Sequence, residues 1–272
     1  MNQLPPWARL RDGGTSRLPL RSVLLAAHPD DETIGASVAL ARFVEPHIVY
    51  LTDGAPLDRR FWSPDMQSAS REAYAEVRRQ EALCALQEAG IPSERVYCLG
   101  AIDQQAIEEV PRLTYELTKL LVTIQPDLLI THPYEGGHPD HDAAALIAAL
   151  AIASLHANSP ELLEMTSYHA RSGGLVTGEF LPGSENVPQC ELQLTRAERE
   201  RKSRMMACHH SQRAVLASFK LDRERLRLAP SYDFSKPPHP GQLWYECLAW
   251  PLSGEKWRAH AIAAVTSIGT LA

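Results

Sequence analysis

Two short clusters of histidine and carboxylate side chains carry the chemistry of this 272-residue chain. The first is the sequence His-Pro-Asp-Asp-Glu at residues 28–32. His28 and Asp31 are three residues apart, so both can turn toward one point where a helix begins, and their imidazole nitrogen and carboxylate oxygen suit a zinc-like ion. Asp30 cannot easily point the same way, which leaves it free to face a metal-bound water. This cluster predicts a metal-dependent hydrolase.

The residues around the first cluster predict a strand–turn–helix unit. The apolar run 23–27 suits a buried parallel strand, and Pro29 suits the first turn of a following helix. A dinucleotide-binding fold would carry glycines at this turn, whereas the acidic residues present here repel phosphate and attract a cation. The alternative is that these acidic residues only interact with the helix dipole, which is worth about 0.3–1 kcal/mol for each.

The second cluster repeats the same arrangement. Residues 126–131 are typical of a buried strand, and the loop after them leads into His-Pro-Asp-His at residues 138–141, where a helix over 142–155 is expected. His138 and His141 are three residues apart, so one imidazole can join the metal while the other stays near an open coordination position. Three protein ligands and a water define a catalytic zinc site rather than a structural one.

In these clusters the chain resembles the LmbE/PIG-L type zinc-dependent de-N-acetylases, which remove acetyl from N-acetylglucosamine-containing substrates. The resemblance rests on residues 27–32 and 138–141. It implies that His28, Asp31 and His141 hold one zinc ion per chain, although another divalent metal would suit the same ligands.

The resemblance also implies the roles of the remaining polar residues. Asp30 would be the general base. His138 would stabilise the oxyanion or protonate the leaving amine, with Asp140 as its partner. Arg78 would reach a sugar hydroxyl or a phosphate, and Tyr134, on the loop before the second cluster, is a further candidate for substrate contact. Three aromatic residues could offer faces to a sugar or acyl group, although packing in the core or in a lid is the favoured explanation for each: Phe61, Trp62 and Trp244.

The order of elements predicts an α/β fold, a Rossmann-like, doubly wound and mostly parallel sheet. Strands alternate with helices from the first cluster to the second. If the strand order is 3-2-1-4-5, the first and fourth strands are neighbours, and both clusters meet in the crevice where such folds bind ligands. The expected strands are 23–27, 46–51, 95–99 and 126–131, and the expected helices are 71–89 and 113–124.

We expect an N-terminal extension at 1–20 and a single deacetylase domain at 21–272. Within that domain, the proline-containing segment 220–272 is expected to pack on the rest. Later strands are expected at 165–170 and 189–194, and the capping-box pattern at Thr195 predicts a helix running towards residue 219.

Composition limits the classes of partner. The 27 basic and 33 acidic residues give a net charge of −6 with no basic run, which argues against nucleic acid. Five cysteines without CxxC spacing are typical of reduced thiols in a cytoplasmic protein. No segment approaches the roughly 20 apolar residues of a transmembrane helix. The expected partner is a small amino sugar or glycoconjugate, and a homo-oligomeric state stays open.

Three functions are compatible with the sequence. The first is a deacetylase acting on an amino sugar, glycolipid or glycoside. The second is a metallo-hydrolase of another amide, an ester or a phosphoester, because the metal ligands alone do not encode the acyl group. The third is a non-catalytic carbohydrate-binding relative, which would have little use for a base at Asp30.

Overall fold

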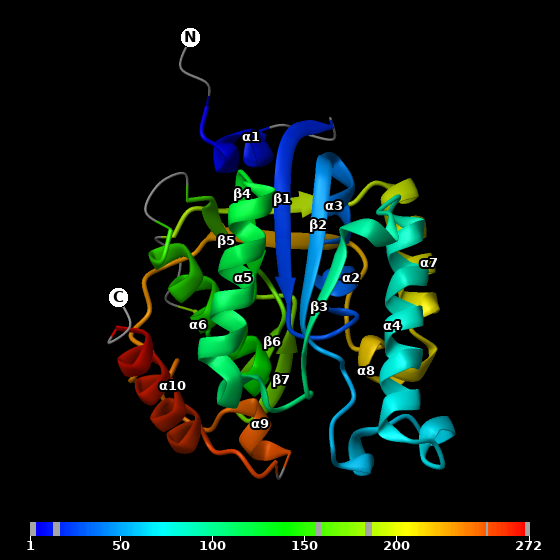
Figure 1. The fold of residues 1–272 in the computed structure, drawn as a ribbon. Helices are drawn as coiled ribbons and strands as arrows, with labels where there is room; N and C mark the ends of the chain where they lie inside the picture. The colour runs from blue at the N-terminus through cyan, green and yellow to red at the C-terminus, as the bar shows by residue number, and fades with distance from the viewer. Residues whose placement is uncertain (1–3, 13–16, 156–158, 183–186, 249, 270–272) are drawn as a thin grey trace.

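A computed structural model describes residues 4–12, 17–155, 159–182, 187–248 and 250–269. Its centre is a seven-stranded sheet in the order β3-β2-β1-β4-β5-β9-β8, and helices cover both faces (Figure 1). The pairs among β1–β5 are parallel, whereas β9 runs antiparallel to β5 and to β8. The expected doubly wound, mostly parallel sheet and its 3-2-1-4-5 order are therefore confirmed. The sheet strands are β1 (Leu18–Ala26), β2 (Phe43–Thr52), β3 (Val96–Ala101), β4 (Leu128–Thr131), β5 (Glu161–Met165), β8 (Gln189–Gln193) and β9 (Arg223–Leu228).

Alternate residues of the buried strands build a core on each face of the sheet. Val23 and Leu25 of β1 pack into a cluster with residues of α5, α6 and α10, while Leu24 and Ala26 pack into a cluster with residues of α1, α3 and α4. This two-sided burial explains why β1 is continuously apolar. The helices are α1 (Pro6–Asp12), α2 (Asp31–Gly35), α3 (Ser37–Arg42), α4 (Arg71–Glu88), α5 (Val110–Ile124), α6 (Pro139–Ala153), α7 (Arg196–Cys208), α8 (Arg213–Leu216), α9 (Trp244–Cys247) and α10 (Gly254–Gly269).

The expected boundary at residue 21 does not match the start of the folded core. Trp7 and Leu10 of α1 are buried in the sheet's core, and β1 already begins at Leu18. At the other end, residues 220–272 contribute β9 to the sheet, and Trp257 of α10 is buried against the α5–α6 face.

Several expected elements differ from those observed. The strand expected at 165–170 is two strands, because β5 ends at Met165 and β6 (Tyr168–Arg171) pairs instead with β7 (Gly174–Thr177) in a separate hairpin. The helix expected to run from 195 towards 219 ends at Cys208 and is followed by a 3-10 turn and the short α8. Pro29 lies just before α2, which begins at Asp31, and not in its first turn.

The central strands bring the two histidine clusters together. β1 lies between β2 and β4, with Ser22 paired to Leu128. Strands β1 and β4 are parallel, so their carboxyl ends lie at the same edge of the sheet, where α2 and α6 begin (Figure 1). None of the helices in the described part of the chain is long and apolar enough to cross a membrane.

Candidate active site

His28, Asp31 and His141 converge at the carboxyl ends of β1 and β4. Each offers one ligand atom, and these three atoms all lie within 4.8 Å of one another. The Nε2 atom of His141 is 3.2 Å from Oδ1 of Asp31, and Nδ1 of His28 is 3.3 Å from its Oδ2. All three residues are buried, so a charged Asp31 needs positive neighbours or a cation.

The hydrogen bonds of His141 fit a metal ligand. Its Nδ1 lies 3.1 Å from the hydroxyl of Ser167, and its Nε2 is buried without a hydrogen-bond partner. When Nδ1–H donates to Ser167, Nε2 keeps its lone pair free and directed at Asp31. A buried, unpartnered imidazole nitrogen beside a carboxylate is what an N, N, O zinc site requires. His132 stacks flat on His141, with ring centroids 3.9 Å apart, as expected of a residue supporting a ligand.

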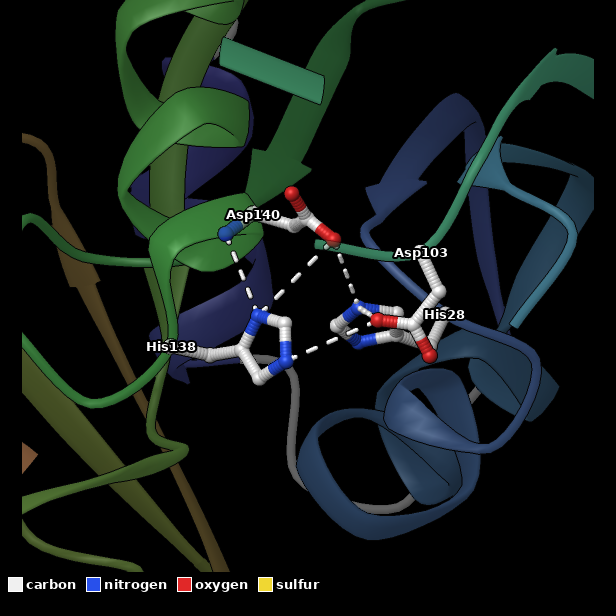
Figure 2. A group of neighbouring side chains, drawn as sticks. All are labelled: His28, Asp103, His138 and Asp140. Carbon is white, nitrogen blue, oxygen red and sulfur yellow. Dashed lines mark hydrogen bonds and ion pairs between the residues drawn. The ribbon is translucent and has the colours of Figure 1, made fainter. Parts of the chain in front are cut away.

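His28 is oriented by two carboxylates, those of Asp103 and Asp140, which Figure 2 shows beside its ring. Its Nε2 lies 3.1 Å from Oδ2 of Asp140 and 3.3 Å from Oδ1 of Asp103. A proton on Nε2 is therefore donated to Asp140, with Asp103 as a nearby charge, and the lone pair of Nδ1 is directed toward Asp31. A carboxylate that holds the far nitrogen of a histidine is a common support for a zinc ligand.

The structure differs from the expected pairing of Asp140 with His138. The carboxylate of Asp140 faces His28 and also accepts the backbone N–H groups of Gln104 and Ala106, at 2.6 Å and 3.1 Å. Its Oδ2 is 3.9 Å from Nδ1 of His138, too far for a hydrogen bond. The contact that orients His138 comes instead from the backbone of Asp140.

His138 is the N-cap of α6. Its Nδ1 accepts the backbone N–H of Asp140 at 3.1 Å, so the ring proton must sit on Nε2. Burial, reinforced by His28 and His141, holds the pKa of His138 well below its usual value. His138 is thus a neutral ring with one N–H free to donate from Nε2, which lies 3.7 Å from Asp103.

Asp30 lies at the start of α2 with a strained backbone. Its φ is +140°, a conformation that residues with a side chain rarely adopt. Its Oδ2 accepts a hydrogen bond from Nη2 of Arg78 at 3.1 Å. Burial raises the pKa of Asp30 to about 7, with Arg78 acting in the opposite direction. A carboxyl with a pKa near neutrality can both accept and return a proton.

Arg78 of α4 connects Asp30 to the two neighbouring loops through hydrogen bonds. It also donates to the carbonyl oxygens of Pro29 and Gly54, at 2.6 Å and 3.1 Å. Gly54 has φ +67°, and a Cβ there would press on Pro29 and on the guanidinium of Arg78, which explains the glycine in the turn after β2. Arg78 lines the cavity, but these N–H groups already donate to Asp30 and to backbone carbonyls of the protein.

The clustered residues form the floor of a cavity of about 320 Å³. All the proposed metal ligands line it, together with Asp30, Arg78 and His138. Phe61 and Trp244 also line it, whereas Trp62 is buried against Tyr74.

Tyr134 does not line the cavity. Its hydroxyl donates to the carbonyl of Lys236 at 2.9 Å and its ring stacks on Trp257. We therefore assign it no contact with substrate.

Among the lining residues that the sequence reasoning did not single out, two contact the proposed catalytic histidines. Asp103 lies in the loop after β3, with a buried Oδ1 that has no hydrogen-bond partner. Trp250, in the C-terminal segment, packs edge-on against His138 with ring centroids 4.5 Å apart. Neither belongs to a motif, and only the position of Asp103 after a parallel strand could have indicated it.

Known proteins resemble this chain in the region that contains both histidine clusters. The family model described as PIG-L, GlcNAc-PI de-N-acetylase, matches residues 23–152, which include both histidine clusters. The chain is 26% identical over 242 residues to 1D-myo-inositol 2-acetamido-2-deoxy-alpha-D-glucopyranoside deacetylase of Gordonia bronchialis, covering 72% of this chain and 85% of the relative. It is 31% identical over 135 residues to a probable N-acetyl-alpha-D-glucosaminyl L-malate deacetylase of Bacillus subtilis, covering 47% of this chain and 59% of the relative.

The fold is also that of a deacetylase from the biosynthesis pathway of teicoplanin. That structure superposes with a TM-score of 0.57 at 15% identity, covering 76% of this chain and 96% of the other. Residues 23–152 match the PIG-L (LmbE-like) deacetylase family model, and the curated relatives that the chain resembles are themselves deacetylases, which are hydrolases.

Proposed function

We propose that this chain is a zinc-dependent hydrolase that removes an acetyl group from the amide nitrogen of an amino sugar, glycolipid or glycoside. The observation that carries the proposal is the buried, unpartnered Nε2 of His141 beside Asp31 and His28. A zinc ion held by these residues would supply a Lewis acid that acidifies a water molecule and polarises a carbonyl.

The residues of the chain then divide the work. Asp30 takes a proton from the attacking water, and Arg78 keeps its carboxylate in place through their 3.1 Å contact. The Nε2–H of His138 donates to the oxygen of the acetyl carbonyl as negative charge develops there. His138 stays neutral because its Nδ1 is occupied as an acceptor, so Asp30 is the group that returns the proton to the leaving amine.

The role of Asp103 follows from its position at the floor of the cavity. Its Oδ1 approaches Nε2 of both His28 and His138, at 3.3 Å and 3.7 Å. It adds negative charge beside two imidazole N–H groups, which favours the tautomers that the metal ligand and the oxyanion donor need.

The experiment is acetate release from N-acetylglucosamine glycosides by metal-free protein and by protein reloaded with zinc. We expect about one ion per chain and activity only after reloading. Alanine at His28, Asp31 or His141 should sharply lower metal occupancy, whereas His210→Ala, an exposed histidine outside the cavity, should not. Full occupancy in all three ligand variants would overturn the ligand assignment. Metal binding without acetate release would favour a carbohydrate-binding protein or another hydrolase.

A further inference from the structure

The exposed residues that line the cavity are apolar except for Ser218, in contrast to the buried histidine and carboxylate groups at its floor. Six lining residues form what we call the apolar collar: Phe61, Leu175, Val215, Phe219, Leu248 and Trp250. They come from four separate parts of the chain: the loop after β2, the β6–β7 hairpin, α8 with the turn after it, and the segment after α9. Apolar side chains from four separate segments therefore surround the opening of this one cavity.

Three residues of the collar are unusually exposed. Leu175, Val215 and Leu248 have 40%, 54% and 37% of their surface accessible. Single exposed aliphatic side chains are normal, but a contiguous apolar patch on a protein surface is a signature of binding. These three line the same cavity, so they expose apolar surface at one site and not at three unrelated places.

The aromatic members connect the collar to the floor. Trp250 packs edge-on against Phe61, with ring centroids 5.5 Å apart, and against His138 at 4.5 Å. Phe219 lies near Tyr168, whose ring contacts His141. When the acetamido group of a sugar lies at the histidine and carboxylate groups, the substituent attached to that sugar therefore lies between these aromatic rings and the exposed aliphatic residues.

The charges around the cavity argue against an anionic substituent. Of the described lining residues, the carboxylates are Asp30, Asp31 and Asp103, and the only lysine or arginine is Arg78. Arg78 is buried and already bonded to Asp30 and to two backbone carbonyls. The collar itself holds no charged side chain, so a phosphate or carboxylate placed there would lose its hydration without gaining a partner.

We propose that the collar binds an apolar aglycone, an alkyl or aryl group carried by the acetamido sugar. The proposal rests on the deacetylase function proposed above and narrows its substrate class. The driving force is removal of apolar surface from water, worth up to about fourfold in affinity for each methylene that becomes buried.

The test is a series of N-acetylglucosamine β-glycosides with methyl, butyl and hexyl aglycones, assayed for acetate release with zinc-loaded protein. From methyl to hexyl, kcat/KM should rise on the order of 10- to 100-fold, mainly through KM. Equal values along the series would overturn the proposal. A methyl glycoside with a hexanoyl in place of the acetyl group, compared with the hexyl glycoside by release of the free amine, provides a second arm. If it is preferred over the hexyl glycoside, the collar serves the acyl group, which also overturns the proposal.

A matched pair of valine variants tests the collar itself. Val215→Ser should lower the hexyl-to-methyl ratio of kcat/KM by about threefold to tenfold. Val122→Ser changes a valine of similar exposure, 60%, on α5 and away from the cavity, and should leave the ratio as it is. An equal ratio in both variants and the wild type would contradict the proposal.

Failure of the deacetylase function can be told apart from failure of the collar. Calorimetric binding of the same glycosides to the Asp30→Asn variant reports on the collar even if none of them is hydrolysed. Affinity that rises with aglycone length supports the collar, and affinity independent of length overturns it.

Discussion

The Nε2 atom of His28 lies 3.1 Å from Oδ2 of Asp140, a residue 112 positions later in the chain. This contact joins the two histidine clusters, because it links a proposed metal ligand after β1 to the first turn of α6 (Figure 2). Asp140 therefore contacts the proposed metal site through His28.

Asp140→Asn should therefore weaken metal binding. The amide keeps one acceptor for the backbone but is a poorer partner for the N–H of His28, and loss of such a support commonly costs about 10- to 100-fold in metal affinity. Competition titration with a metal indicator measures this. Unchanged affinity, with activity alone reduced, would show that Asp140 serves His138 instead.

His138→Ala should keep the metal and lose activity. Removing a single oxyanion donor costs on the order of 10²- to 10³-fold in kcat. The alanine also removes the cap of α6, so thermal unfolding should be recorded beside the kinetics. His138→Asn is the informative companion, since its side chain can still accept the N–H of Asp140 and restores the cap. A wild-type rate in His138→Ala would refute the role of His138.

Glu224→Gln should destabilise the whole fold. Glu224 and Lys202 form an ion pair at 2.9 Å with both side chains 0% exposed, and Glu224 also accepts the N–H groups of Val38 and Ala39 at the start of α3. Leaving Lys202 charged and unpaired costs roughly 3–5 kcal/mol in the free energy of unfolding. Urea unfolding measures it, and Glu200→Gln, from an exposed pair with Arg196, should change stability by less than about 0.5 kcal/mol. Equal effects of the two substitutions would contradict this account.

Glu164 should make stability fall as the pH rises. Burial raises its pKa from 4.5 to about 7, despite its 2.7 Å contact with Arg227. A carboxyl with a raised pKa stabilises the fold below its unfolded pKa, and that contribution is lost as the pH rises through 7. The loss from this group amounts to about 3 kcal/mol between pH 4.5 and 8. Urea unfolding of Glu164→Gln at pH 5 and pH 8 should show a smaller decrease than the wild type; an identical decrease would exclude Glu164 as its source.

The sequence predicted the residues of the candidate site better than it predicted the terminal parts of the fold. His28, Asp31 and His141 could be predicted to converge because two motifs follow neighbouring parallel strands, and strand ends are fixed by topology. Asp103 was missed, since a single aspartate in a loop looks like any solvated turn residue and only its position after a parallel strand sets it apart. The support for His138 was assigned to the wrong group of Asp140, because spacing does not tell a side-chain contact from a backbone one.

Strand β9 shows where patterning failed. Its sequence, Arg-Glu-Arg-Leu-Arg-Leu, is rich in charged residues, and yet two of them are buried. Glu224 forms an ion pair with Lys202, and Arg227 forms one with Glu164. Such residues have partners far away in the chain, so local hydrophobicity gives no sign that they lie inside. The same holds for Tyr134, whose contacts with Lys236 and Trp257 come from the C-terminal segment.

The most direct test of the central claim compares wild type with Asp30→Asn for acetate release from an N-acetylglucosamine glycoside, with zinc content measured in the same samples. The asparagine preserves the size of the side chain but cannot take a proton from water. The account predicts about one zinc ion in both proteins and a rate lower by on the order of 10²- to 10⁴-fold in the variant. A zinc-loaded Asp30→Asn variant that releases acetate at the wild-type rate would contradict it.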